Sequence, residues 1–299
     1  MSRLVDLHIH SCYSDGIHTP ATLVRLAADN GLAAIALADH DAVEGIDEAL
    51  AAGAEAGVEV IPAVELSVEL GRYRDLHLLG YCIDHRDAKL RQLLAEYRAV
   101  RDNRGKAIVD KINRRLVAAR QPPISYDEVL DGVEGAVGRP HIGRVLVGRG
   151  HASTMEDAFR KFLIPCDVPK RYLPAGEAIA QIHRAGGIAV LAHPTTVTED
   201  RRRLREVIVR LLGLGLDGIE VYNNMCYKDD MLFLESLATE HGLLMTGGSD
   251  YHGFEEDVQI GIGRGGLAVS YRLAEAVMSR AASRRKETES PLRHDADHG

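Results

Sequence analysis

The chain opens with Val5-Asp6-Leu7-His8-Ile9-His10, followed closely by Ser14-Asp15-Gly16. Val5, Leu7 and Ile9 alternate with the two histidines, which is the period of a β-strand. Residues two apart on a strand point to the same face, so both imidazoles should project together, as two ligands of one metal ion would. Asp15 follows on the turn that leaves the strand and can add a carboxylate. The alternative is a strand with two incidental histidines, and the later histidines argue against it.

Composition limits the classes of function. The 299 residues are enough for one large domain or two ordinary ones. The net charge of -8 makes long nucleic acid a poor partner, although metal ions can help an acidic chain to hold a small anion. Four scattered cysteines without a CxxC pair argue against a sulfur-ligated zinc site and fit a reducing cytoplasm. We expect no signal peptide, and no apolar run is long enough to span a membrane.

Strand and helix patterns alternate along much of the chain. After the first strand, helical patterns run from Thr19-Pro20 to about Asn30 and from Gly45 to Ala56. Later ones cover 175–184, 200–212, 229–241 and 270–281. Further strands are expected at 33–38, 58–64, 76–81, 188–192, 218–222 and 243–246, which makes seven in all. This alternation predicts an α/β fold with parallel strands and helical crossovers.

The alternation breaks after about Asp84. Residues 88–119 are strongly helical and basic, Pro122-Pro123 ends them, and shorter helices are expected over 129–162. We interpret 100–172 as a helical insertion that caps a site between barrel segments 1–99 and 173–282. Alternatively, the basic face of the helical segment is a solvated surface that binds nothing. Residues 283–299 are polar and without apolar period, so we expect a disordered tail in which His294 and His298 have no structural role.

Residues able to bind metal stand at or just beyond the expected strand ends. They are His8, His10, His40, Glu65, His77, His193, Glu220, Asp250 and His252. The carboxyl ends of parallel barrel strands open onto one face, so these side chains should converge there. Nitrogen and oxygen ligands suit zinc, manganese or iron and argue against copper(I) or an iron–sulfur cluster. So many candidates are too many for one ion, which predicts a cluster of two or three divalent ions.

These motifs together resemble the PHP (polymerase and histidinol phosphatase) family. The resemblance rests on the HxH...SDG opening, the ADHD segment, Glu65, LAHP and GSDYH, and it runs from about residue 3 to 265. It implies a distorted seven-stranded β/α barrel, in agreement with the strands expected above. By the same resemblance, manganese is favoured, with zinc or iron as alternatives.

The family's metal pattern assigns the ligands to three ions. His8, His10, Glu65 and Asp250 would hold the first; Glu65, bridging, with His77 and His193 the second; and Asp15, His40 and His252 the third. Glu220 is not a usual ligand, and we treat it as a structural acid or a partner of the ligands.

The expected insertion narrows the branch within this family. The GRPHIGR segment, the AFRKFL helix and AIAQIHRAGGIAVLAHP resemble nucleoside 3',5'-bisphosphate phosphatases and related 5'-3' exoribonucleases. In that branch the insertion shapes the substrate pocket. Val168-Pro169-Lys170-Arg171-Tyr172 is more basic than its counterpart in relatives. Lys170 and Arg171 therefore either add a phosphate contact or lie on the surface.

Phosphate-ester hydrolysis needs a nucleophile at neutral pH, neutralisation of charge on the phosphoryl oxygens and help for the leaving oxygen. A metal cluster can supply all three. We expect a hydroxide bridging the ions to attack phosphorus, with Glu65, Asp15 and Asp250 as catalytic residues. A metal-bound water, Asp15 or Asp250 would assist the leaving group, and the sequence does not choose among them. Arg139 and His141 are candidates for holding a second phosphate, because arginine offers a planar pair of donors. The alternative for Arg139 is a surface ion pair.

The first functional hypothesis is hydrolysis of the 3'-phosphate of 3',5'-bisphosphonucleotides such as 3',5'-bisphosphoadenosine. Alternatives are a 5'-3' exoribonuclease on short 5'-phosphorylated RNA, and a hydrolase of histidinol phosphate or a cyclic ribose phosphate. A non-catalytic PHP module is a fourth possibility, against which the complete ligand set argues. The expected partners are a small phosphorylated nucleotide or short RNA, without membrane or long DNA. We expect a monomer or a small homo-oligomer.

Overall fold

The computed structural model describes residues 3–131, 133 and 137–289. Its sheet follows the order β8-β7-β6-β4-β3-β2-β1-β9, and β5 pairs with β3. The strands are β1 (Leu4–Ile9), β2 (Leu32–Leu37), β3 (Glu59–Leu70), β4 (Tyr73–Tyr81), β5 (Leu173–Pro174), β6 (Ile188–Leu191), β7 (Gly218–Tyr222), β8 (Leu244–Gly247) and β9 (Val269–Ser270). The seven longer strands are the seven expected from the sequence, although several boundaries differ.

β4 runs antiparallel to both neighbours, so the expectation of an entirely parallel sheet was wrong. β3 continues to Leu70, and only Gly71-Arg72 separate it from β4. Two residues cannot make the crossover that a parallel pair needs, whereas they suffice for a hairpin, and Gly71 supplies a φ of +62°. His77 therefore lies within β4, opposite Ser67. This reversal brings His77 to the same end of the barrel as the carboxyl ends of the parallel strands.

β1 departs from strict alternation. Val5 and Leu7 lie in a cluster of apolar side chains that surrounds α10 (Tyr271–Glu289), whereas Ile9 packs with residues of α1 (Pro20–Asp29). The pairing of β1 with β2 shifts register between Asp6 and Ile9, which accounts for the change of face. Beyond β1, the Asp250 N–H donates to the His8 carbonyl (2.8 Å) and the His10 N–H to the Tyr251 carbonyl (2.9 Å). These bonds nearly close the sheet into a barrel.

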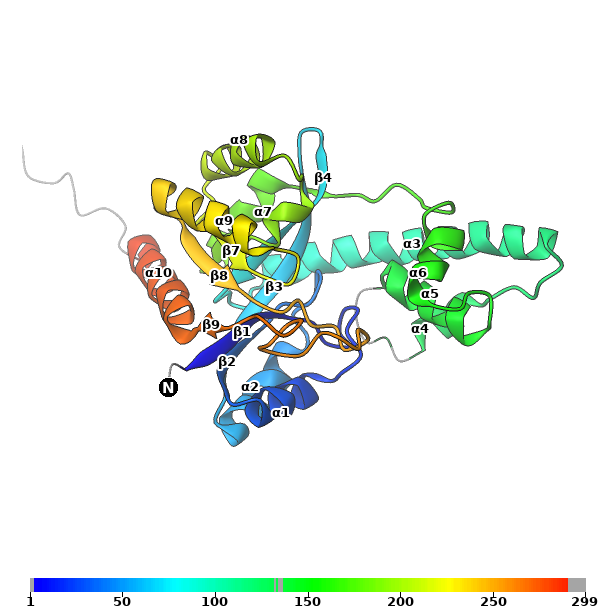
Figure 1. The fold of residues 1–299 in the computed structure, drawn as a ribbon, viewed down its shortest axis with the longest axis horizontal. Coiled ribbons are helices and arrows are strands. Elements are labelled where there is room, and N and C mark those ends of the chain that lie inside the picture. Colours follow the sequence, from blue (N-terminus) through cyan, green and yellow to red (C-terminus); the bar gives the residue numbers. More distant parts are fainter. Residues whose placement is uncertain (1–2, 132, 134–136, 290–299) are drawn as a thin grey trace, which may run out of the picture.

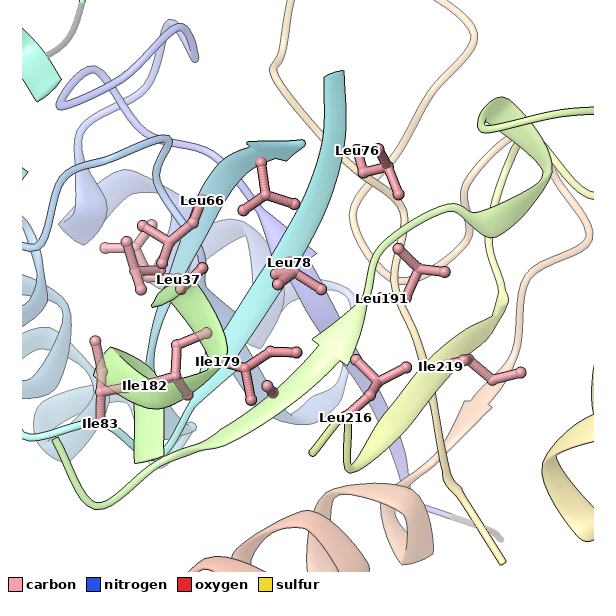
Figure 2. Packing of buried hydrophobic residues seen from close by; sticks show 14 of the residues in the cluster. Leu37, Leu66, Leu76, Leu78, Ile83, Ile179, Ile182, Leu191, Leu216 and Ile219 are labelled. Carbon is pink, nitrogen blue, oxygen red and sulfur yellow. The ribbon is translucent and has the colours of Figure 1, made fainter. Parts of the chain in front are cut away.

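Helices cover the outside of this barrel. Besides α1 and α10 they are α2 (Ile46–Ala56), α7 (Ala175–Arg184), α8 (Arg201–Leu212) and α9 (Lys228–His241). Thr19 caps α1, with Pro20 at the first helical position as expected. Figure 2 shows Ile179 and Ile182 of α7 packed beside Leu78 and Leu191 of the strands. Each such buried side chain contributes about 1.5–3 kcal/mol relative to exposure. The result is a distorted β/α barrel.

A second helical unit extends from the barrel. The long helix α3 (Ala88–Ala118) leaves the barrel and carries the shorter helices at its far end (Figure 1). These are α4 (Tyr126–Leu130), α5 (Arg139–Gly148), α6 (Met155–Ala158) and the π-helical turn η1 (Phe159–Leu163). They share a separate apolar cluster that includes Ile108, Ile112, Leu146 and Leu163. This cluster supports our proposal that residues 100–172 form an insertion.

The C-terminal helix is longer than expected. α10 continues to Glu289, so the prediction that disorder begins at Ser283 was wrong. Arg284 pairs with the buried Asp217, and Arg285 Nε donates to the Gly186 carbonyl (3.1 Å). These contacts explain why the helix persists. His294 and His298 lie outside the described residues. Within the described part of the chain, every helix is too short or too polar to cross a lipid bilayer.

Candidate metal centre

Two glycines allow the loops after β1 and β8 to approach the first strand closely. A Cβ on Gly16 would lie 2.3 Å from the His10 carbonyl oxygen, and one on Gly248 would lie 2.4 Å from the His8 nitrogen. Neither contact is sterically possible, so any larger residue would push its loop away. The glycines of the SDG and GSD motifs therefore bring Asp15 and Asp250 next to the histidines of β1.

Glu65 occupies the middle of the site. Its side chain is buried, and five imidazoles face its two oxygens. The nearest ring nitrogens lie 3.0–3.3 Å from Oε2 for His8, His10 and His40, and 3.0–3.1 Å from Oε1 for His77 and His193. One carboxylate thus joins histidines from four different strands and loops. This is the arrangement expected of a bridging ligand.

The two aspartates also lie against the histidines of the site. Asp250 Oδ1 is 3.1 Å from His10 Nε2 and 3.4 Å from His8 Nε2. Asp15 Oδ1 is 3.3 Å from His252 Nε2, while Asp15 Oδ2 is 3.9 Å from a ring nitrogen of His40. The structure therefore brings all nine sequence-predicted ligands into one continuous cluster.

The cluster divides into groups much as the sequence suggested. His8, His10, Glu65 and Asp250 form one group of converging ligand atoms, and Asp15, His40 and His252 form another that also includes His10. His40, Glu65 and His77 form a third. His193 adjoins it, because its Nε2 lies 3.3 Å from His77 Nδ1. The assignment of each ligand to a particular ion stays a proposal.

The donor set fits divalent ions. His8 Nε2, His10 Nε2, Asp15 Oδ1, His40 Nδ1 and Glu65 Oε2 are all buried, and none makes a hydrogen bond of normal geometry within the described structure. Buried polar atoms without partners are expensive, and a cation would satisfy them. Two ligands, each ~2.1 Å from one ion, are about 3.0 Å apart at octahedral angles and about 3.4 Å at tetrahedral angles. The spacings around Glu65 and Asp250, 3.0–3.4 Å, fall in this range.

Outer partners hold the imidazoles in place. Glu220, buried on β7, lies 3.0 Å from His8 Nδ1 through Oε1 and accepts the His193 N–H through Oε2 (2.7 Å). Thr196 Oγ1 is 2.9 Å from His193 Nδ1. Such contacts select the tautomer and leave the other ring nitrogen for a metal. Glu220 thus contacts ligands, as the sequence suggested. His193 itself has a φ of +27°, a strained value that surrounding contacts must maintain.

The ionisable groups perturb one another strongly. Burial raises the pKa of Glu65, but the imidazoles of His40, His77 and His8 outweigh this and hold it well below its usual value. Burial lowers the pKa of His77, yet Glu65 and Asp75 raise it to about 8. In the absence of cations, protons therefore compensate the carboxylates. Metal binding at this site must displace protons, so it should strengthen as pH rises.

A basic cavity of about 290 Å³ adjoins the cluster. Asp15, His40 and His77 form its inner wall, and the outer wall carries Arg101, Arg104, Arg139 and Lys170. The cations come from α3, from the start of α5 and from the segment after η1. The helical unit and the barrel therefore meet over the metal-facing side chains, and they concentrate positive charge there.

Most of these cations are held by contacts within the cavity wall. Arg104 donates to the Val168 carbonyl (2.7 Å) and pairs with Asp167. Lys170 Nζ donates to Ser67 Oγ (2.8 Å) and Asp75 Oδ1 (2.9 Å). Arg139 is more loosely held, because its guanidinium lies 3.7 Å from Asp167 and its side chain is 31% exposed. Arg139 is thus the cation best able to turn toward a ligand.

The other two predicted substrate contacts lie elsewhere. His141 is buried, its Nδ1 accepts the Gly138 N–H (2.9 Å), and burial lowers its pKa to about 4, so it is neutral near pH 7. Arg171 lies over the Tyr97 ring (5.4 Å to the centroid) and lines a neighbouring hollow instead. Their role in substrate binding stays a prediction, and neither belongs to the cavity lining.

Sequence reasoning missed Arg101 and Arg104 as cavity residues. The sequence places them in a basic helix, for whose charged face a solvated surface was the alternative interpretation. Their spacing of three places them on one face of α3, which is the signal that could have indicated a shared target. Arg101 Nε also pairs with Asp41 (3.0 Å), the residue after His40. This contact ties the long helix to the metal-facing loop.

Known proteins resemble this chain in both sequence and fold. The PHP domain family profile matches residues 6–133. A 5'-3' exoribonuclease of Haemophilus influenzae is 35% identical over 255 residues, covering 84% of this chain and 91% of the relative. A 3',5'-nucleoside bisphosphate phosphatase of Chromobacterium violaceum is 33% identical over 253 residues, covering 83% and 87%. A crystal structure from Bifidobacterium adolescentis, assigned as a metal-dependent phosphoesterase, has a TM-score of 0.81 at 30% identity and covers 94% of this chain and 97% of its own.

These relatives extend over both the barrel and the helical unit, so the likeness is not confined to the motifs around the histidines. The resemblance suggested by the HxH, LAHP and GSDYH segments is confirmed. The chain belongs to the PHP domain family of phosphoesterases.

Proposed function

We propose that the chain is a metal-dependent phosphomonoesterase that removes the 3'-phosphate of 3',5'-bisphosphonucleotides, such as 3',5'-bisphosphoadenosine. The observation that carries this proposal is the basic cavity beside the histidine cluster. One phosphate of such a substrate can lie at the cluster while the other reaches the arginines. A cytoplasmic location is part of the proposal, since the scattered cysteines fit a reducing compartment.

The nine clustered side chains would hold two or three divalent ions, with manganese favoured and zinc or iron as alternatives. When bound, such ions stabilise charge on phosphoryl oxygens and provide a nucleophile at neutral pH. Glu65 would hold two of the ions together, because its two oxygens face different histidines. Glu220 orients His8 and His193 from outside the cluster.

The cavity would bind and orient the substrate. Arg139 would grip the non-reacting 5'-phosphate with two parallel donors. Phe159 lies 5.6 Å from its guanidinium and keeps the side chain at the cavity rim. Lys170 and Arg101 share Ser67 Oγ and add positive charge nearer the cluster. A substrate with a single phosphate would use only part of this wall.

A 5'-3' exoribonuclease is the second candidate. The bond broken, between the 3'-oxygen and phosphorus, is the same in both reactions, and the cavity would hold the 5'-phosphate of an RNA end in the same way. Relatives of the two kinds match the chain at similar identity, 35% and 33%. The two functions therefore differ in what lies beyond the scissile phosphate.

Phosphate release from a substrate panel tests the proposal. The panel contains 3',5'-bisphosphoadenosine, short 5'-phosphorylated RNA, histidinol phosphate and a cyclic ribose phosphate, each with the manganese-loaded enzyme. RNA chains are also followed by product length. The expected result is the highest kcat/KM on 3',5'-bisphosphoadenosine, and Asp250→Asn should abolish it if the activity belongs to this site. Preference for histidinol phosphate or the cyclic phosphate would contradict the proposal.

A further inference from the structure

A second hollow lies near His193 of the metal-facing cluster. Its volume is about 300 Å³, and its walls come from the segment between β6 and α8 and from the segment between β7 and α9. Thr196, in the 3-10 turn η2 (Pro194–Thr196), is part of the wall and contacts the ring of His193 (2.9 Å). Thr196 thus connects the wall of the hollow to one ring of the cluster, although none of the nine clustered side chains lines the hollow itself.

This hollow and the basic cavity reach the cluster from different directions. The cavity reaches it through Asp15, His40 and His77, and the hollow through the turn next to His193. Among the described residues, none lines both. The His77 and His193 rings lie 5.1 Å apart, centroid to centroid. His193 presents Nε2 to Glu65 and Nδ1 to Thr196, so its ring lies between the cluster and the wall of the hollow.

The lining suits a flat, uncharged ring. Tyr227 is 84% exposed, the highest value among the exposed large apolar side chains of the described chain, and Met225 beside it is 44% exposed. An aromatic ring in this position offers a stacking face worth about 1–3 kcal/mol per nucleobase. Phe233 also lines the hollow, with the Arg201 guanidinium 5.6 Å from its ring centroid.

The charge of the hollow excludes a further phosphate as its main occupant. Arg201 is paired with Asp230 (2.8 Å), and Glu199 adds another negative charge to the lining. The hollow thus has two carboxylates against one cation, whereas the basic cavity has four cations against the carboxylates of Asp15, Asp75 and Asp167. A nucleoside satisfies this chemistry better than an anion does.

We propose that this hollow holds the nucleoside on the 3' side of the scissile phosphate, with its base stacked on Tyr227. The inference rests on the proposed function, because it assumes a 5'-phosphate in the basic cavity. In the reaction, a water oxygen bonds to phosphorus and the bond from phosphorus to the 3'-oxygen breaks. That oxygen takes a proton, and the phosphate stays on the downstream nucleoside. The protein then acts on short 5'-phosphorylated RNA as well as on bisphosphonucleotides.

The test compares two substrates in three variants. The substrates are a 5'-phosphorylated adenosine dinucleotide and 3',5'-bisphosphoadenosine, which has no downstream nucleoside. Tyr227→Ala should lower kcat/KM on the dinucleotide, relative to kcat/KM on 3',5'-bisphosphoadenosine, by about five- to a hundredfold. This factor is the kinetic equivalent of one lost stacking contact. Tyr227→Phe keeps the ring and should keep the ratio. Leu232→Ala, an exposed residue of α9 that does not line the hollow, is the control and should also keep it.

A dinucleotide whose second residue lacks its base completes the design. The kcat/KM of the wild type should be lower on this substrate than on the intact dinucleotide by the same factor. The Tyr227→Ala variant should show no further loss of kcat/KM when the base is removed, because the base and the tyrosine ring act as a pair. An unchanged ratio in Tyr227→Ala would overturn the inference, as would a wild type that hydrolyses bisphosphoadenosine but not the dinucleotide. If wild type hydrolyses neither, the proposed function itself fails.

Discussion

Replacing Glu65 by glutamine tests the bridging ligand directly. The two side chains have nearly the same shape, so the buried site should stay filled while one negative charge disappears. Five imidazole nitrogens lie 3.0–3.3 Å from the two carboxylate oxygens. An amide offers only one oxygen, so one side of the bridge must face an NH₂ group that cannot accept a cation. We therefore expect the variant to lose more than one metal equivalent per chain.

The accompanying loss of turnover should exceed ~10²-fold, which corresponds to about 2.7 kcal/mol of transition-state stabilisation. Metal content by inductively coupled plasma mass spectrometry and phosphate release would be measured on the same preparation. Glu69→Gln is the matched control, because Glu69 lies on the same strand and pairs with Arg74 at the surface (3.8 Å). Full metal content with near-normal turnover in the Glu65 variant would refute the bridging assignment, and loss of a single equivalent would restrict Glu65 to one ion.

Other variants separate binding, orientation and stability. Arg139→Ala should lower kcat/KM on 3',5'-bisphosphoadenosine ten- to a hundredfold, for a lost contact of about 1.5–3 kcal/mol, and leave a simple aryl phosphate nearly unaffected; equal losses on both would place it at the reacting group. Glu220→Gln should weaken metal affinity about 10–100-fold, measured by manganese titration, because two ligands lose a buried partner. Truncation after Glu289 should leave turnover and melting temperature unchanged. Truncation after Ala282 should lower the melting temperature by several degrees, since buried Asp217 loses its arginine; equal melting temperatures would contradict this.

Much of the site was predictable because its motifs are local. Thr19-Pro20 marks the start of a helix by itself. The alternation of apolar and polar side chains from Val5 to His10 indicates a strand, whichever strands lie beside it in the sheet. Nine residues with nitrogen or oxygen ligand atoms stand at the expected strand ends. They predict a cluster if the strands form one barrel, because the strand ends then meet at one face. The prediction was wrong about the direction of β4, because a two-residue turn and a longer loop after Leu70 have the same signature in a polar segment.

The sequence by itself determined the kind of chemistry, since imidazoles and carboxylates at these positions can serve little else than divalent cations. The tertiary structure alone decided what surrounds them. Arg101 and Arg104 line the cavity beside the cluster because α3 contacts the barrel through Asp41 and Ser67. Glu220 meets both His8 and His193 because β7 lies beside β6. These contacts join residues 27 to 212 positions apart. Residue type and spacing record local geometry, whereas such contacts depend on how whole elements pack, and no short segment carries that information.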